Sequence, residues 1–182
     1  MTGVPRSGTS LVLQMLAAGG APLLADGSRP ADADNPRGYL EWAPAKRLPR
    51  ESGWLAGARG RAVKVVHALV PSLPPSERYR VVLARRAWPE VLASQAAMLE
   101  RRGEAPPPLA PERLVAVYEA QLGELAAWAR ARGAPLLEVA HARLVAEPAP
   151  VAAELGAFLG GGLDAAAMAR AVVPALQRQR AV

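Results

Sequence analysis

"GVPRSGTSLVLQMLAA" occupies residues 3–18 and joins a glycine-containing turn directly to an apolar segment. A turn at the start of a helix exposes backbone N–H groups, and these act with the helix dipole to attract anions. The hydroxyls of Ser7, Thr9 and Ser10 add hydrogen-bond donors, and Arg6 adds a positive charge. The stretch therefore predicts an anion-binding turn followed by a helix.

The spacing of Gly3 and Gly8 is that of a Walker A loop, in which the second glycine is followed by lysine and then by serine or threonine. Here Thr9 follows Gly8 directly and the lysine is missing. In nucleoside triphosphatases that lysine reaches the β- and γ-phosphates. We therefore expect the loop to hold a single phosphate or a phosphosulfate rather than a triphosphate with magnesium.

Length and composition favour one globular domain. The chain has 182 residues, is 51% apolar and contains no cysteine, so we treat residues 1–182 as a single domain without disulfides or thiolate metal sites. No apolar run is long enough to span a membrane. The turn that begins at Gly3 leaves no room for a signal peptide, so we expect a cytoplasmic protein.

The charge favours an anionic partner. The formal net charge is +6, carried by 20 arginines and two lysines, which suits a nucleotide, a phosphate or a sulfate. Aromatic residues make up 4% of the chain and do not alternate with basic runs, so nucleic acid is not expected as a partner. The sequence does not specify an oligomeric state.

Short β-type runs alternate with longer helical ones along the chain. We expect a strand ending near Val4, further strands over 61–66, 79–84 and 135–140, and helices over 7–18, 88–102, 112–132 and 148–160. Segments 25–43 and 103–111 are predicted to be irregular. This order predicts a three-layer α/β fold, with a parallel sheet of about four or five strands flanked by helices. Because only four residues precede Pro5, the first strand is either a stub or begins upstream.

The stretch "PRSGTS" (5–10) resembles the 5′-phosphosulfate-binding loop of sulfotransferases that use 3′-phosphoadenosine 5′-phosphosulfate (PAPS). In that family the loop reads proline, lysine or arginine, serine or threonine, glycine, threonine, and threonine or serine. The resemblance implies a P-loop-like fold and PAPS as the donor. It assigns the 5′ side of the donor to Arg6, Ser7, Gly8, Thr9 and Ser10.

A second motif, "RRAWPEVLASQ" (85–95), follows a predicted strand. The family carries an arginine at the end of such a strand and a serine eight residues later, and these two hold the 3′-phosphate of PAPS. Arg86 and Ser94 have that separation, so the resemblance assigns the 3′-phosphate to them. Pro89 stands one place later than in the family's usual pattern, which leaves Arg85 as a substitute for Arg86.

The C-terminal part also resembles the family. Residues 136–160 match its strand, a short acidic-proline step and a helix ending in Phe-Leu-Gly. His141 and Arg143 stand where tyrosine and aspartate are commoner, so no catalytic role is transferred to them. We expect His141 to be a packing or surface residue.

Sulfuryl transfer needs cations to stabilise the developing negative charge and a base to take the proton of the acceptor. The scheme that the resemblance implies requires no metal. Arg6 and Lys64 are the candidate cations, Lys64 because it is similar to a strand lysine that several sulfotransferases place near the donor. His67 is one candidate base. It lies three residues after Lys64, whereas the family's histidine lies two residues after the lysine, and positions three apart point to opposite faces of a strand.

Carboxylates offer two other candidate bases. Aligned without gaps on the tyrosylprotein sulfotransferases, Asp26 falls one residue before their catalytic glutamate and Arg29 falls on their arginine. Glu41 lies in "NPRGYLEW" (35–42), which resembles a segment of bacterial sulfotransferases. Ordinary turn and helix-start chemistry would also explain both carboxylates. We rank Asp26 first, Glu41 second and His67 third.

The resemblance implies transfer of a sulfuryl group from PAPS to a hydroxyl or an amine of an unknown acceptor. Two alternatives stay open. A P-loop nucleotide kinase or NTPase would need a loop lysine and a magnesium-binding aspartate after an apolar strand, and the sequence offers neither. A catalytically weak nucleotide-binding or interaction domain would retain the phosphate loop and lack the base.

Overall fold

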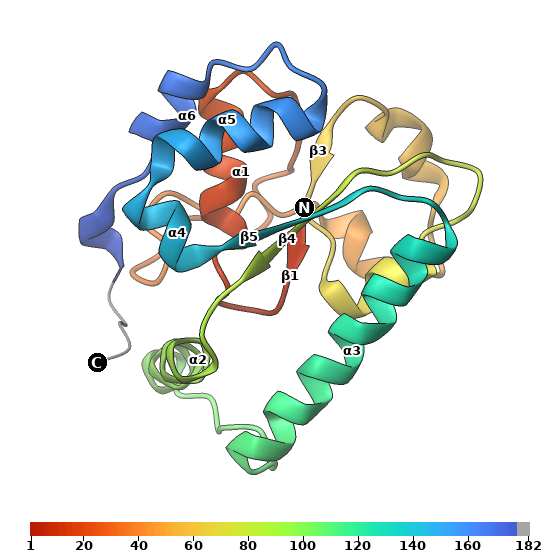
Figure 1. The fold of residues 1–182 in the computed structure, drawn as a ribbon. Helices are drawn as coiled ribbons and strands as arrows, with labels where there is room; N and C mark the ends of the chain where they lie inside the picture. Colours follow the sequence, from red (N-terminus) through yellow and green to blue (C-terminus); the bar gives the residue numbers. More distant parts are fainter. Residues whose placement is uncertain (178–182) are drawn as a thin grey trace.

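The computed structural model describes residues 1–177 and contains a parallel sheet of three short strands (Figure 1). These strands are β1 (Thr2–Gly3), β4 (Val81–Arg85) and β5 (Leu136–Ala140), in the order β1-β4-β5. In this register Gly3 pairs with Ala84, and Ala84 with Val139. The carboxyl ends of these strands therefore meet at the same edge of the sheet.

A second parallel pair extends this arrangement. It consists of β2 (Leu23–Leu24) and β3 (Ala62–Val63). The N-terminal nitrogen of Met1 donates a hydrogen bond to the Val63 carbonyl (2.9 Å), and the Val65 N–H donates one to the Met1 carbonyl (3.0 Å). These bonds place β3 beside the start of β1. The expected sheet of four or five strands is therefore found as a three-stranded sheet and a two-stranded pair.

Helices cover both faces of the sheet. The α-helices are α1 (Thr9–Ala18), α2 (Trp88–Arg102), α3 (Pro111–Ala131), α4 (His141–Ala146), α5 (Pro148–Leu159) and α6 (Ala165–Arg170). Short 3₁₀ helices are η1 (Ala43–Arg47), η2 (Gly53–Ala58), η3 (His67–Ser72) and η4 (Pro174–Leu176). In residues 1–177 none of the helices is long and apolar enough to cross a membrane.

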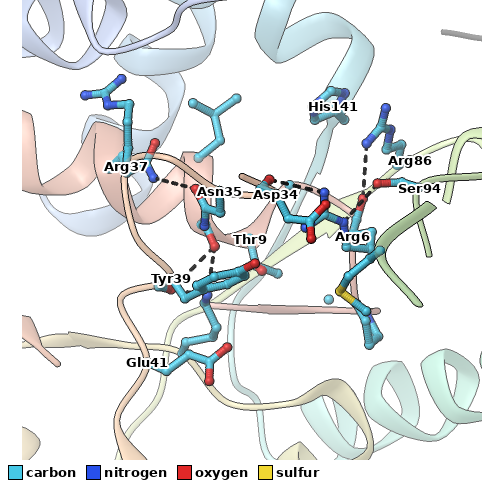
Figure 2. Close-up of a pocket in the computed structure, with 18 of the residues that line it drawn as sticks. Arg6, Thr9, Asp34, Asn35, Arg37, Tyr39, Glu41, Arg86, Ser94 and His141 are labelled. Atoms are coloured by element: carbon cyan, nitrogen blue, oxygen red, sulfur yellow. Dashed lines mark hydrogen bonds between the residues drawn. The ribbon is translucent and has the colours of Figure 1, made fainter. Parts of the chain in front are cut away.

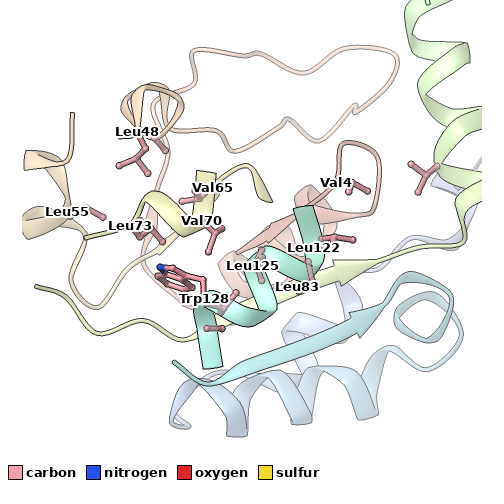
Figure 3. Packing of buried hydrophobic residues seen from close by; sticks show 14 residues of the cluster. Val4, Leu48, Leu55, Val65, Val70, Leu73, Leu83, Leu122, Leu125 and Trp128 are labelled. Carbon is pink, nitrogen blue, oxygen red and sulfur yellow. The ribbon is translucent and has the colours of Figure 1, made fainter. Parts of the chain in front are cut away.

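Alternating residues of β4 divide the core between the two faces. Val82 packs in a cluster with α1, α5 and α6, whereas Val81 and Leu83 pack in a second cluster with α3 and η3. Figure 3 shows the second cluster, in which Leu125 and Trp128 of α3 lie close to Val70. Successive side chains of a strand point to opposite faces of the sheet, so a strand that is buried on both faces contributes to both clusters. The three-layer arrangement expected from the sequence is therefore present.

Most predicted elements are confirmed, and α2 begins and ends where the sequence places it. Its second residue is Pro89, which suits the first turn of a helix, and Gly103 ends it with a positive φ of 64°. The strand expected over 61–66 is much shorter, because β3 covers Ala62–Val63 and the chain turns into η3 at His67. Helix α4, which follows β5 without a break, was not expected.

Candidate functional site

The turn between β1 and α1 depends on close packing at both of its glycines. A Cβ atom on Gly3 would lie 2.5 Å from Ser7 Oγ and 2.9 Å from the Ala84 carbonyl oxygen. Gly8 has a φ of 103°, and a Cβ there would lie 2.7 Å from Cδ2 of His141. Both positions therefore exclude a side chain, which explains the glycine spacing noticed in the sequence.

The start of α1 offers free hydrogen-bond donors. Gly8 is the N-cap residue, and no side chain caps the helix. The first intrahelical bond runs from the Val12 N–H to the Gly8 carbonyl, so the N–H groups of Thr9 and Ser10 lie ahead of the helical ladder. Such groups, at the positive end of a helix dipole, are suited to an anion.

A pocket of about 400 Å³ opens at this turn (Figure 2). Its size is within the usual range of small-molecule sites. Most of the residues expected at the site line it, and they come from four separate parts of the chain: Arg6, Gly8, Thr9 and Ser10, then Glu41, then Lys64, and finally Arg86 and Ser94. The pocket also has apolar lining from Leu11, Val65, Met98 and Val145.

The two predicted anion-binding groups are in direct contact. The Arg6 Nε–H donates a hydrogen bond to Ser94 Oγ (2.9 Å), and an Arg86 guanidinium N–H donates one to the Arg6 carbonyl (3.3 Å). Arg86 also pairs with Glu90 at 2.6 Å. Ser94 accepts one bond and keeps its own O–H as a donor. The turn and the arginine–serine pair therefore face the same space, as Figure 2 shows.

Arg85 points away from this space. Its guanidinium lies 3.4 Å from Glu119 of α3 and 3.9 Å from Glu138 of β5, and it is not among the residues that line the pocket. Neighbouring residues at a strand end point in opposite directions, so only one arginine of the pair reaches the pocket. That residue is Arg86.

Lys64 approaches the start of α1 from β3. Its Nζ donates hydrogen bonds to Ser10 Oγ (3.0 Å) and to the Tyr39 carbonyl. Burial lowers the pKa of Lys64 to about 8, and the positive charges of Arg29 and Lys46 add to this, against the opposing effect of Glu41. At neutral pH the group is therefore still mainly a cation, close to the proposed 5′ side.

Glu41 is a partly buried carboxylate among cations. Its Oε1 lies 3.3 Å from Arg29, its Oε2 lies 2.6 Å from Lys46 Nζ, and its side chain is 13% exposed. Burial acts to raise the pKa of Glu41, but the hydrogen bond from Lys46 and the charges of Lys46, Lys64 and Arg29 outweigh it, so the pKa lies below its ordinary value. Glu41 is therefore ionised at neutral pH and able to accept a proton.

The other two candidate bases do not line the pocket. The Asp26 carboxylate accepts hydrogen bonds from the N–H groups of Ser28 (2.9 Å) and Ala43 (2.7 Å). A hydrogen bond with the Ser28 side chain, together with these two backbone N–H groups, lowers the pKa of Asp26 to about 2, and Asp26 serves as a turn residue. His67 is buried, and its Nε2 lies 2.7 Å from Oε1 of Gln121 in α3. Of the three candidate bases, Glu41 is therefore the one that lines the pocket.

Ser7 does not face the pocket, although the resemblance assigned it to the 5′ side of the donor. It is fully buried beneath the turn, does not line the pocket, and its N–H donates to the Val4 carbonyl (3.2 Å). Ser7 therefore supports the turn, and its hydroxyl does not face the pocket.

His141 is buried, as expected of a packing residue, and it also lines the pocket. Burial, with a smaller effect from Arg86, lowers the pKa of His141 to about 4, so its ring is neutral at pH 7. Within residues 1–177 its Nδ1 is buried without a hydrogen-bond partner. The position of His141 directly after β5 could have indicated that it lines the pocket, because ligands bind at the carboxyl ends of parallel strands.

Sequence reasoning did not single out four residues of the irregular segment 25–43, which crosses the pocket. Asp34, Asn35, Arg37 and Tyr39 line it, and Gln14 of α1 holds this segment by donating to Asn35 Oδ1 (3.4 Å) and the Gly38 carbonyl (3.2 Å). The irregular composition of the segment gave no indication of its path.

Comparisons with protein-family models, with curated proteins and with solved structures found no match to this chain. The assignment of the site therefore depends on the geometry described above.

Proposed function

We propose that this chain transfers a sulfuryl group from PAPS to a hydroxyl or an amine of an acceptor. One observation carries the proposal. Anion-binding groups from the β1–α1 turn, from β3 and from the β4–α2 region line one pocket of about 400 Å³. A nucleotide with an anion at each end of its ribose requires this kind of arrangement.

The donor would lie across the carboxyl edge of the sheet. Its 5′-phosphosulfate would accept hydrogen bonds from the N–H groups at the start of α1, and Arg6 and Lys64 would balance its charge. Its 3′-phosphate would contact Arg86 and the free O–H of Ser94. The strand order supports a P-loop-like fold, because β1 lies between β3 and β4 and delivers the turn to the middle of the edge.

The chemistry follows from the positions of Glu41 and Lys64. The acceptor oxygen or nitrogen forms a bond to sulfur, while the bond from sulfur to the 5′-phosphate oxygen breaks. Glu41 takes the acceptor's proton, and Lys64 and Arg6 stabilise the charge that develops on the leaving oxygen. Adenosine 3′,5′-bisphosphate and the sulfated acceptor are the products.

Calorimetric titration tests the choice of nucleotide. Adenosine 3′,5′-bisphosphate is expected to bind, and ATP with magnesium is not, because the turn has no Walker lysine. Arg86→Ala should weaken the binding of the bisphosphate by about tenfold or more, since a charge-assisted contact is lost. Arg85→Ala is the matched control and should bind normally. Binding of ATP in preference to the bisphosphate would refute the proposal.

A nucleotide-binding domain without turnover is the second candidate, and one observation favours it. The cations around Glu41 lower its pKa and therefore its strength as a base. Transfer of label from radioactive PAPS to a panel of alcohols, phenols and amines separates the two. Labelled product supports the transferase, whereas bisphosphate binding without any labelled product supports the second candidate.

A further inference from the structure

We infer that Arg101 is a further anion-binding residue of the pocket. In the structure its guanidinium pairs with the carboxylate of Asp34, and a phosphate of the ligand replaces this carboxylate when the ligand binds. This inference rests on the proposed function, because the ligand is taken to be the donor nucleotide. Neither residue belongs to the motifs that indicated the donor site.

The position of Arg101 follows from the geometry of α2. Ser94, Met98 and Arg101 all line the pocket, and their separations of four and three residues place them on one face of the helix. At a rise of about 1.5 Å per residue, the stretch from Ser94 to Arg101 is about 10 Å long. This face therefore forms a continuous wall, with a hydroxyl near one end and a guanidinium near the other.

Asp34 reaches this wall from the opposite side of the pocket. Its side chain is 6% exposed, although it belongs to the irregular segment that crosses the pocket, and its carboxylate pairs with Arg101. Its backbone carbonyl accepts a hydrogen bond from Arg6 (3.3 Å). Asp34 thus contacts two guanidinium groups that line the pocket, one through its backbone carbonyl and one through its carboxylate.

The charges explain why a carboxylate is held there. Arg6, Lys64, Arg86 and Arg101 all line the pocket, and Asp34 brings a negative charge among them. A phosphate carries more charge and more acceptor oxygens than one carboxylate, so it competes for the same guanidinium. The Arg101 side chain is 42% exposed, which means that solvent screens its pair with Asp34 and makes the exchange easy.

The inference predicts opposite effects from the two partners. Arg101→Ala removes a phosphate contact and should weaken the binding of adenosine 3′,5′-bisphosphate by about tenfold. Asp34→Asn removes the competing charge but keeps the shape, and should strengthen binding about three- to tenfold. In the double variant most of that gain should disappear, because the residue for which Asp34 competes is gone.

The measurement is calorimetric titration of adenosine 3′,5′-bisphosphate at constant ionic strength. Arg102→Ala and Glu104→Gln are the matched controls, because these neighbours pair with each other at 3.3 Å and do not line the pocket. Both should bind like the wild type. Thermal unfolding of each variant checks that it folds, and Arg101→Lys, which keeps the charge, should retain more affinity than Arg101→Ala.

The outcomes separate this inference from the proposed function. If Arg86→Ala loses affinity while Arg101→Ala and Asp34→Asn bind like the wild type, the inference is overturned and the proposed function stands. If neither the wild type nor Asp34→Asn binds the bisphosphate, both are overturned. Binding that is strengthened in Asp34→Asn and weakened in Arg101→Ala supports both.

Discussion

Replacement of Gly8 by alanine adds one methyl group at a tightly packed point of the β1–α1 turn. The backbone there has a φ of 103°, which costs a residue with a side chain about 1–3 kcal/mol. The added Cβ would also lie 2.7 Å from Cδ2 of His141, whose ring is buried and must shift. Overpacking of this kind costs about 1–3 kcal/mol more. We therefore expect a loss of about 2–6 kcal/mol in the free energy of unfolding.

Gly20→Ala provides the matched control. Gly20 has a φ of 89° and no neighbouring atom within 4 Å of the added Cβ, so it incurs only the backbone cost. Equilibrium unfolding in urea gives both changes in free energy, with slopes like that of the wild type. Calorimetry should show that Gly8→Ala loses affinity for adenosine 3′,5′-bisphosphate and that Gly20→Ala keeps it. Equal destabilisation by the two substitutions would contradict the packing of the turn against His141.

Three further predictions concern the base, the cation and the core. Glu41→Gln removes the proposed base, so it should lower the turnover of PAPS about 100-fold or more without weakening bisphosphate binding. Asp26→Asn should leave turnover unchanged, and the reverse pattern would favour Asp26 as the base. The pH profile of kcat/KM should fall as the pH rises through about 8, because Lys64, whose pKa is lowered to about 8, loses its positive charge there; a profile without this fall would argue against Lys64. Leu125→Ala should cost about 2–5 kcal/mol in urea unfolding, since this side chain is fully buried, and Val117→Ala on the exposed side of α3 should cost much less; similar losses would refute the assignment of the helix faces.

Local signals in the sequence were sufficient for the long elements. Helix α2 could be placed over 88–102 because proline suits its first turn and glycine its end, and both effects act within a few residues. The turn at 3–8 could be recognised because its glycine spacing reflects packing close to the backbone. Periodicity also assigned β4 and β5 to a buried parallel sheet.

Which candidate base lines the pocket could not be predicted, because this depends on the path of an irregular segment. Asp26 and Glu41 lie on neighbouring backbone, joined by a hydrogen bond from the Asp26 N–H to the Glu41 carbonyl (3.1 Å). Only Glu41 lines the pocket, because the Asp26 carboxylate closes a turn. The contact between Asp34 and Arg101 likewise joins residues far apart in the chain, and no local pattern indicates it.

Amide NMR spectra recorded during addition of adenosine 3′,5′-bisphosphate test most directly whether one nucleotide spans the turn and α2. The account predicts that the N–H signals of Gly8, Thr9 and Ser94 move together, with a single dissociation constant. Signals that move at only one of these two places, or that follow two different dissociation constants, would contradict it.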